Sequence, residues 1–533
     1  MTSDRYTYIV VGSGAAGAVV ANRLSADPSH RVLLLEAGGR DWNPLIHVPV
    51  GFTKLTTPDV NWGFSTVAQP QMNQREMWYP QGRTLGGSTS INAMIYIRGH
   101  QHDYDHWKAL GNEGWSYEDV LPYFRKSENN ERFHDAYHGT GGDMNVTSQV
   151  QANPLSKAFV RGCQELGLPF NADVNGAEQD GVTFYDVTQR NVRRESAATA
   201  FLHPVEKRPN LTVISRALAA KVLVQNGRAI GVHYLRKKQL RTAYADGEVI
   251  LSGGAINSPA LLLRSGIGPA DELRQLGIDV VHNLPGVGKN LQDHMDVYLT
   301  AETAPVSYNQ EDRIDRAIRH GVQYLLYKTG PMTACVCEAG AFIRSSADVE
   351  SPDIQIHCLP AYVIDHGRQR VKGHGMTINT CHLRPKSIGS VTVRSADPTE
   401  KPLIDPNFCG DPEGHDWKIC IEGFRWGRRI LNSEALRPFI KREHMPGADV
   451  QTDEDVRSYI RQWSKTDYHP VGSCKMGSDE LAVVDTQLRV HGIEGLRVID
   501  ASIMPTLISG NTQAPSIMIG EKGAAIVLAN QLV

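Results

Sequence analysis

The strongest constraint on the fold lies in the first 36 residues. An apolar run rich in β-branched residues, Tyr6–Val11, leads directly into the glycine-rich turn Gly12–Gly17. A stretch of small residues continues to Leu24, and a second apolar run, Val32–Leu35, ends in Glu36. Strand, glycine turn, helix, strand and acid in this order predict a βαβ unit that binds the ADP part of a dinucleotide.

The small residues of this turn each have a physical role. Gly12 permits a sharp change of direction after the strand, and Gly14 lets the backbone approach a pyrophosphate because it carries no Cβ. Gly17 lets the helix pack closely on the sheet. Ala15 and Ala16 open the helix, whose first N–H groups and partial positive charge favour phosphate binding. We therefore expect all five residues to contact or support the dinucleotide.

The acidic residue at the end of the second strand selects between dinucleotides. Glu36 lies 19 residues after Gly17 and precedes Ala37. At this position a carboxylate accepts hydrogen bonds from a ribose 2′-hydroxyl and would repel a 2′-phosphate, so NADP is disfavoured. The motif alone does not separate FAD from NAD, and glycine-rich runs also occur as ordinary turns.

Length and charge exclude several classes of protein. The chain has 533 residues and a formal net charge of −3, which predicts two or more lobes and disfavours nucleic-acid binding. No run of about 18 uninterrupted apolar residues occurs, so no transmembrane helix is expected, and no amphipathic membrane anchor stands out. The first strand begins by Tyr6, which leaves no room for a signal peptide and predicts a cytoplasmic protein.

The eight cysteines are too sparse for a disulfide framework. Cys335 and Cys337 form the only close pair in the sequence, and no second Cys or His pair follows at the spacing of a zinc site. Reduced thiols within packed structure are therefore expected, and no metal site is predicted.

The order of the expected elements indicates one domain inserted into another. Alternating strand and helix patterns occur at the start, near 210–290 and near 495–533, whereas residues 340–405 hold successive strand-like runs. Two alternating strands are expected on either side of the turn Gln225–Gly227. Further helices are expected over Trp115–Phe124, Asp416–Asn432, Asp453–Ser464 and Pro515–Leu532. The first of these has Ser116 as its N-cap and Asp119 in the position of a capping box.

We predict an α/β fold, α+β overall, with a Rossmann-type nucleotide-binding domain built from separated segments. Residues 1–155, 200–300 and 465–533 would form this domain. Residues 156–199 and 301–464 would form an inserted substrate domain, with a mostly antiparallel sheet backed by helices.

A second cluster of glycines and hydroxyl residues, Gly82–Asn92, indicates a loop whose backbone lies against a flat ligand. Alone, this cluster would also fit an ordinary surface turn. It does not stand alone, because small-residue segments recur at Gly254–Gly268, Tyr468–Gly472 and Ser509–Pro515. Such segments, spread over the whole chain, point to one extended ligand site.

Together these segments resemble the signature stretches of the glucose–methanol–choline (GMC) oxidoreductases, which are FAD-dependent. The resemblance runs from Tyr6 to the terminal helix, and both signatures, Gly82–Asn92 and Gly254–Gly268, match. Within the family the chain looks most like bacterial dehydrogenases of aliphatic or polyethylene glycol-type primary alcohols, and like sorbose and choline dehydrogenases. The resemblance implies FAD as the cofactor of the Rossmann-type domain.

The resemblance also implies how FAD is held. Some family members attach FAD covalently through a histidine just before the Asn of the first signature. Ile91 holds that position here, and its aliphatic side chain is no nucleophile, so a non-covalent FAD is expected.

Position by position, the family implies further FAD contacts. Val222 is expected to meet the adenine through its backbone, with a plain core residue as the alternative. The remaining contacts are expected from Trp62, Arg83, Gly87, Asn92, Ala93, Met94, Ile95, Tyr468, Asp500, Ala501, Asn511 and Thr512.

Oxidation of an alcohol needs a base for the hydroxyl proton, and histidine has an ordinary pKa suited to that role near neutrality. Among 20 histidines, His469 matches the family's catalytic histidine; otherwise it would be structural. The rate should fall as the pH drops through the range in which histidine titrates. Asn511 matches the family's catalytic partner and would orient the alcohol, with a cap on the terminal helix as the alternative.

The resemblance implies a dehydrogenase that oxidises primary alcohols to aldehydes by proton abstraction at His469 and hydride transfer to flavin N5. The electron acceptor would be a quinone or similar carrier, and contact with the inner membrane would be peripheral. A choline or sorbose-type polyol dehydrogenase, an alcohol oxidase using O2 and an FAD-binding protein without turnover stay open. Choline would need an aromatic cage or a carboxylate, for which Glu338 is a candidate.

Overall fold

The first sheet joins strands from distant parts of the chain. The structure is a computed structural model that describes residues 5–309, 311, 313–369 and 371–530. The strand order is β11–β2–β1–β14–β13–β12, with β26 paired to β14. The strands are β1 (Arg5–Val11), β2 (Val32–Leu35), β11 (Leu211–Ile214), β12 (Ala217–Gln225), β13 (Arg228–Arg236), β14 (Gln239–Leu251) and β26 (Leu496–Val498). A Rossmann-type sheet built from separated segments is thus confirmed.

Local sequence explains the pairing within this sheet. β1, β2, β11, β14 and β26 run parallel, and the last four residues of β1 and all of β2 are buried, as expected for strands covered on both faces. β12, β13 and β14 are antiparallel. The expected turn between β12 and β13 is confirmed, with Asn226 and Gly227 at positive φ of 49° and 74°, as a tight hairpin turn requires.

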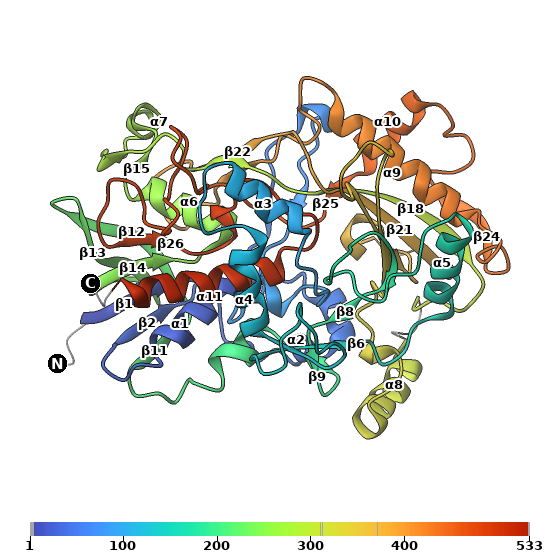
Figure 1. The fold of residues 1–533 in the computed structure, drawn as a ribbon, viewed down its shortest axis with the longest axis horizontal. Helices are drawn as coiled ribbons and strands as arrows, with labels where there is room; N and C mark the ends of the chain where they lie inside the picture. Colours follow the sequence, from blue (N-terminus) through green and yellow to red (C-terminus); the bar gives the residue numbers. More distant parts are fainter. Residues whose placement is uncertain (1–4, 310, 312, 370, 531–533) are drawn as a thin grey trace.

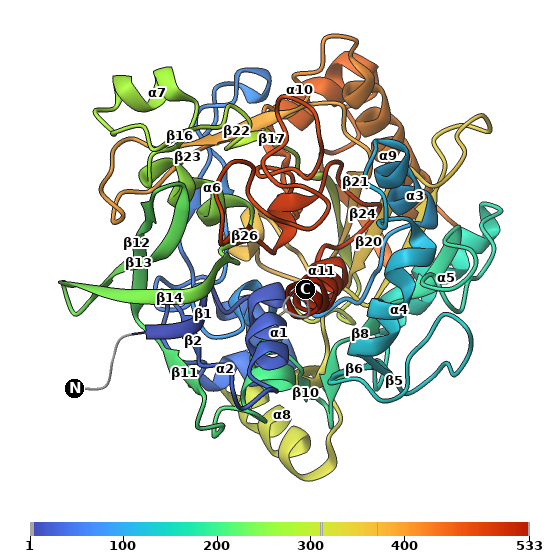
Figure 2. The same ribbon diagram turned by 60° about the vertical axis from the view of Figure 1, so that its left-hand side comes forward.

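Two helices from opposite ends of the chain pack together on this sheet. α1 (Ala15–Leu24) contacts α11 (Gln513–Ala529) along its length, and Figure 2 shows α11 nearly end-on beside α1. A Cβ at Gly520 would lie 2.8 Å from the Ala16 carbonyl oxygen, so this close approach requires glycine. The expected helix Pro515–Leu532 is confirmed as far as Ala529, and its positions 531 and 532 lie outside the described residues.

The second sheet is antiparallel, in the order β24–β18–β21–β20–β19–β7, with β25 paired to β18. Figure 1 shows it on the opposite side of the molecule from β1 and β14. Its strands are β7 (Gly181–Phe184), β18 (Met295–Thr303), β19 (Ala339–Ile343), β20 (Ile354–Leu359), β21 (Gly375–His382), β24 (Ile440–Met445) and β25 (Lys465–Thr466). The predicted domain boundaries at 300 and 465 therefore fall inside β18 and at the start of β25.

Helices back the second sheet as expected. α5 (Pro154–Glu165) and α9 (His415–Leu431) contact its strands, and α10 (Asp453–Trp463) packs on α9 and β18. The expected capping box is confirmed in α4 (Tyr117–Ser127), which begins after Ser116. The other α-helices of the described residues are α2 (Pro44–His47), α3 (Gln101–Ala109), α6 (Gly254–Arg264), α7 (Ala270–Gln275) and α8 (Ile314–Tyr327).

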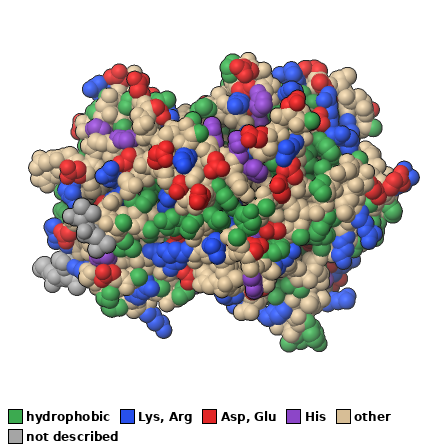
Figure 3. All heavy atoms as spheres, in the orientation of Figure 1, with side chains coloured by type: hydrophobic (Ala, Val, Ile, Leu, Met, Phe, Trp, Pro, Cys, Tyr) green, Lys and Arg blue, Asp and Glu red, His purple; other side chains and the backbone are tan. Residues whose placement is uncertain are grey.

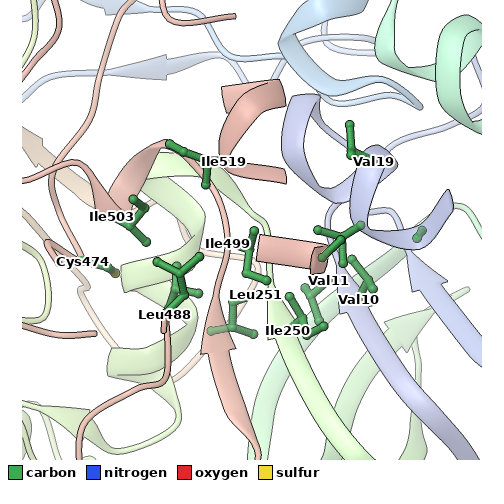
Figure 4. Close-up of a cluster of buried hydrophobic side chains, with 14 of the residues drawn as sticks. Val10, Val11, Val19, Ile250, Leu251, Cys474, Leu488, Ile499, Ile503 and Ile519 are labelled. Atoms are coloured by element: carbon green, nitrogen blue, oxygen red, sulfur yellow. The ribbon is translucent and has the colours of Figure 1, made fainter. Parts of the chain in front are cut away.

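Each sheet has its own buried apolar core. In the first core, Val10 and Val11 of β1 meet Leu251 of β14, with Ile499 and Ile519 from the end of the chain (Figure 4). In the described part of the chain, no helix is both long and apolar enough to cross a bilayer. Each sheet is thus supported by its own apolar core.

Candidate active site

A cavity of about 1610 Å³ is lined by residues of both sheet regions. It includes the turn after β1 and also His357 of β20 and Asn379 of β21. Most residues that the sequence proposed for FAD and catalysis line it. These are Gly12, Gly14, Ala15, Ala16, Glu36, Ala37, Trp62, Arg83, Gly87, Asn92, Ala93, Met94, Ile95, Tyr468, His469, Asp500, Ala501, Asn511 and Thr512.

Two of the proposed residues do not line the cavity. Gly17 packs α1 on the sheet, because a Cβ there would lie 2.0 Å from the Gly12 carbonyl oxygen. The expectation for Val222 is wrong. Its N–H donates to Ser265 Oγ at 2.8 Å and its side chain is buried in the core, whereas Ala217–Ala219 of the same strand line the cavity.

The glycine turn has the geometry that the sequence predicts. Gly12 has φ of 101°, and a Cβ there would lie 2.3 Å from the Ser252 carbonyl oxygen. Gly14 is the N-cap of α1 and makes no side-chain cap, while a Cβ on it would meet nothing within 4 Å. The free N–H groups at the start of α1 therefore face open space inside the cavity.

Glu36 is held by the turn itself. Its Oε2 accepts from the N–H and Oγ of Ser13, at 3.1 and 2.6 Å, and its Oε1 accepts from the Gly38 N–H at 2.7 Å. Burial raises the pKa of Glu36 above its ordinary value, against these donors. The carboxylate is thus fixed at the cavity wall, and its bond to a ribose hydroxyl remains a prediction.

His469 follows β25 and is fixed on three sides. Its backbone N–H donates to Asp293 Oδ1 at 2.8 Å. Its Nδ1 lies 3.0 Å from His294 Nδ1, and its Nε2 lies 3.0 Å from Asn511 Nδ2. Asp293 also accepts from Tyr79 and Thr466, and burial raises its pKa to about 7.

The position of the proton on the His294 and His469 rings follows from one acceptor, the Leu383 carbonyl oxygen. His294 Nε2 lies 3.1 Å from the Leu383 carbonyl oxygen, which can only accept, so Nε2 carries the proton of neutral His294. Its Nδ1 must then accept from His469 Nδ1–H. This leaves the lone pair of His469 on Nε2, beside Asn511.

The Asn511 amide is oriented from its other side. Its Oδ1 accepts from Gln355 Nε2 at 3.2 Å, so its Nδ2 points to His469 Nε2. The helix cap of α11 is Thr512, so the alternative of Asn511 as that cap is wrong. One N–H of Asn511 contacts His469, and the second remains for a substrate oxygen.

Burial keeps both histidines neutral. It lowers the pKa of His469 to about 3, although the nearby Asp467 carboxylate opposes this, and lowers the pKa of His294 to about 4. Burial alone would raise the pKa of Asp467, but the hydrogen bond and charge of His357 hold it below its usual range. His469 is therefore a neutral, buried base whose Nε2 lone pair accepts from Asn511.

Comparison with known proteins decides the family. The model of the GMC oxidoreductase N-terminal region matches residues 6–296, and that of the C-terminal region matches residues 385–520. The chain belongs to the GMC oxidoreductases. As a GMC oxidoreductase, it is an FAD-dependent enzyme.

This GMC oxidoreductase resembles several characterised proteins over nearly its whole length. It is 48% identical to the alcohol dehydrogenase [acceptor] of Pseudomonas putida, over 98% of this chain and 96% of that protein. It is 44% identical to the mitochondrial choline dehydrogenase of Mus musculus, over 98% and 89%. The crystal structure of pyridoxine 4-oxidase from Mesorbium loti aligns with a TM-score of 0.89 and 29% identity, over 97% and 98% of the two chains.

FAD fits the cavity of this GMC oxidoreductase on three observations. The space beside Gly14 is open, and the start of α1 has no side-chain cap, so phosphate oxygens can reach free N–H groups. The volume of about 1610 Å³ exceeds the roughly 300–1,000 Å³ of ordinary ligand pockets. The cavity therefore has room for a dinucleotide and a substrate.

Several residues of this GMC site were missed in the sequence. They are Ser13, Ala217–Ala219, Asp293, His294, Gln355 and Gln513. Asp293 and His294 belong to a polar run, Gln292–His294, that directly precedes the apolar strand β18; a buried acid–histidine pair beside an apolar run was the signal that could have pointed to them. Gln355 gave no such signal, because it lies within a buried strand.

Proposed function

We propose that this enzyme oxidises primary alcohols to aldehydes, with His469 as the base and Asn511 as the residue that orients the alcohol. One observation carries the proposal: His469 and Asn511 both line the cavity, with His469 Nε2 3.0 Å from Asn511 Nδ2. Bound FAD supplies the hydride acceptor. We propose a quinone or similar carrier as the final electron acceptor.

The chain's own groups account for the proton. An alcohol hydroxyl that replaces the Asn511 amide at His469 Nε2 gives its proton to the imidazole, and an N–H of Asn511 that donates to the alcohol oxygen stabilises the developing negative charge. The imidazolium that forms is oriented by His294 and lies 3.7 Å from Asp467 Oδ2, measured from Nδ1. That carboxylate stabilises the positive charge.

Glu338 does not supply the carboxylate that a choline substrate would need. Glu338 is fully buried, and its carboxylate accepts from Asn153 N–H, Ser156 Oγ and Tyr308 OH. It is not among the residues that line the cavity. The candidate carboxylate for a quaternary ammonium is thus occupied elsewhere.

An anaerobic substrate screen tests the proposed function. The holoenzyme is mixed with hexanol, sorbitol or choline, and loss of the visible flavin absorbance is followed. We expect hexanol to bleach the flavin fastest. Faster bleaching by choline or sorbitol would show that the preferred substrate is choline or a polyol. If no alcohol bleaches the flavin, the proposed function is contradicted. Release of hydrogen peroxide, measured against dye reduction, separates an oxidase from a dehydrogenase.

We predict that FAD is released when the protein is denatured. Ile91 lines the cavity at the position where some relatives carry the attached histidine, and its aliphatic side chain forms no bond to a flavin. After acid precipitation, the yellow colour should appear entirely in the supernatant. Flavin that stays with the washed pellet would show a covalent link through another residue.

We predict a flat pH profile for flavin reduction from about pH 5 to 8. A lowered pKa of about 3 means that His469 loses its proton-accepting form only as the pH falls towards that value, well below the ordinary histidine range. We therefore expect the fall in rate well below the value of about pH 6.5 that an ordinary histidine would give. Stopped-flow reduction at saturating alcohol measures this, and a rate that halves near the ordinary value would contradict the burial of the base.

We predict that His294 acts as a positioning residue for His469. In His294→Ala the Nδ1–H of His469 has no partner, so the imidazole can reorient, and flavin reduction should slow by about 10–100-fold. His294→Gln should recover most of the rate, because its amide can donate to the Leu383 carbonyl and accept from His469. Equal losses in both variants would indicate a merely structural role.

A further inference from the structure

α8 exposes its apolar face to solvent. Ile314, Ile318, Val322, Leu325 and Leu326 follow the spacing that places residues on one side of a helix. Their exposed fractions range from 50% to 81%. The inward side holds Tyr324, which is buried and donates to the Val192 carbonyl oxygen at 2.9 Å. Surface helices ordinarily turn the apolar face inward, so α8 is oriented the opposite way.

This exposure is concentrated in one place. In the described part of the chain, 18 large apolar side chains are exposed, and six of them belong to this 14-residue helix. Figure 1 shows α8 projecting from the body of the molecule, and Figure 3 shows hydrophobic side chains at that lower edge. An apolar surface gathered on one projecting helix marks an interaction site.

The charge around the apolar face is positive. Residues 311–328 contain four basic and three acidic residues, and two of the basic residues form ion pairs, Arg313 with Asp315 and Arg316 with Glu311. The other two, Arg319 and Lys328, are exposed. Long basic side chains beside an apolar helix face are the arrangement that binds the interface of an anionic bilayer.

α8 also borders the cavity. Arg313, Ala317 and His320 are among the cavity-lining residues, as is Met332 in the segment that follows the helix. The inner side of α8 thus faces the cavity while its outer side is apolar. Whatever covers α8 also lies at an edge of the site.

We propose that α8 docks this enzyme on the surface of an anionic membrane, with its apolar side chains in the interface and the cavity edge toward the bilayer. The helix is amphipathic and long enough to lie in the interface, though the sequence alone did not mark it as an anchor. That a lipid-soluble acceptor reaches the cavity from this side rests on the proposed function.

A second copy of the chain suits this surface less well. A stable protein interface buries about 800 Å² per partner, and one side of one projecting helix offers few side chains for that. A symmetric pair of α8 helices would also bring the basic residues of both copies together. A bilayer with anionic headgroups satisfies the apolar and the charged parts at once.

Vesicle co-sedimentation of the full-length holoenzyme tests the proposal. Phosphatidylglycerol–phosphatidylcholine vesicles should pellet the protein, and neutral phosphatidylcholine vesicles or high salt should pellet less. The double variant Ile318→Gln/Leu325→Gln should lose at least about tenfold in partition. Leu240→Gln, which changes an exposed leucine of β14, should bind as the wild type does.

Two results would overturn the proposal. One is a wild-type protein that stays in the supernatant with phosphatidylglycerol vesicles. This result includes the case in which the protein is a dimer in solution and the double variant disrupts that dimer. The other is a double variant that binds as tightly as the wild type. Dye-coupled oxidation of a soluble alcohol is measured in parallel. If the wild type shows no such activity, the proposed function is contradicted but the membrane docking is not. If the double variant keeps this activity, the substitutions have affected docking and not the oxidation of the alcohol.

Discussion

Replacing His469 by Ala should leave a yellow, folded protein that an alcohol no longer reduces at a useful rate. Loss of a general base costs about 10²–10⁴-fold, or roughly 3–5 kcal/mol of barrier. The fold should persist, because Asp293 binds the backbone N–H of residue 469, which alanine keeps. Anaerobic stopped-flow measures flavin reduction directly, so acceptor turnover does not obscure the effect.

A matched control separates the loss of the catalytic base from the general effect of replacing a histidine by alanine. His134 is exposed and lies outside the cavity, so His134→Ala should reduce its flavin as fast as the wild type. Thermal melting of both variants checks that neither has lost the fold. Flavin reduction within about threefold of wild type in His469→Ala, against the expected loss, would remove His469 from the proposed mechanism.

Alanine at Gly12 and at Gly14 should have opposite consequences. At Gly12 the added Cβ would meet the Ser252 carbonyl oxygen at 2.3 Å, in a backbone conformation with φ of 101°. Overpacking and left-handed strain together cost about 3 kcal/mol or more, which lowers the melting temperature of the FAD-free protein by about 3 °C or more. The fold itself is therefore damaged.

At Gly14 the added Cβ meets no protein atom within 4 Å, and φ is an ordinary −69°. The FAD-free protein should therefore melt within about 1 °C of wild type. The methyl group occupies the space proposed for the pyrophosphate, so the FAD dissociation constant should rise at least about tenfold. Unchanged FAD affinity in Gly14→Ala, or unchanged melting in Gly12→Ala, would contradict the assignment of this turn.

Features set by neighbouring residues were predictable from the sequence. The βαβ turn, the capping box at Ser116 and the hairpin at Asn226–Gly227 depend on local backbone chemistry, and all three are confirmed. Domain boundaries depend on more than neighbouring residues. The cut at residue 300 falls inside β18, because a strand's membership in a sheet depends on partners far away in the chain.

The strand that carries Val222 shows a second limit. β12 alternates its side chains between two faces, but register shifts interrupt its pairing with β13. The adenine contact that was transferred from the family by sequence position thus fell on Val222, whose N–H already donates to Ser265 Oγ. Only the folded sheet shows that Ala217–Ala219 face the cavity instead.

The sequence by itself determined the FAD-type turn, the family and the identity of the candidate base, because these depend on residue types at short, fixed spacings. The tertiary structure alone decided which nitrogen of His469 keeps a lone pair, since that depends on Leu383 and His294, which are distant in sequence. It also decided the outward orientation of α8. An amphipathic pattern predicts that a helix has an apolar and a polar face, but only packing determines which of the two faces contacts the rest of the protein.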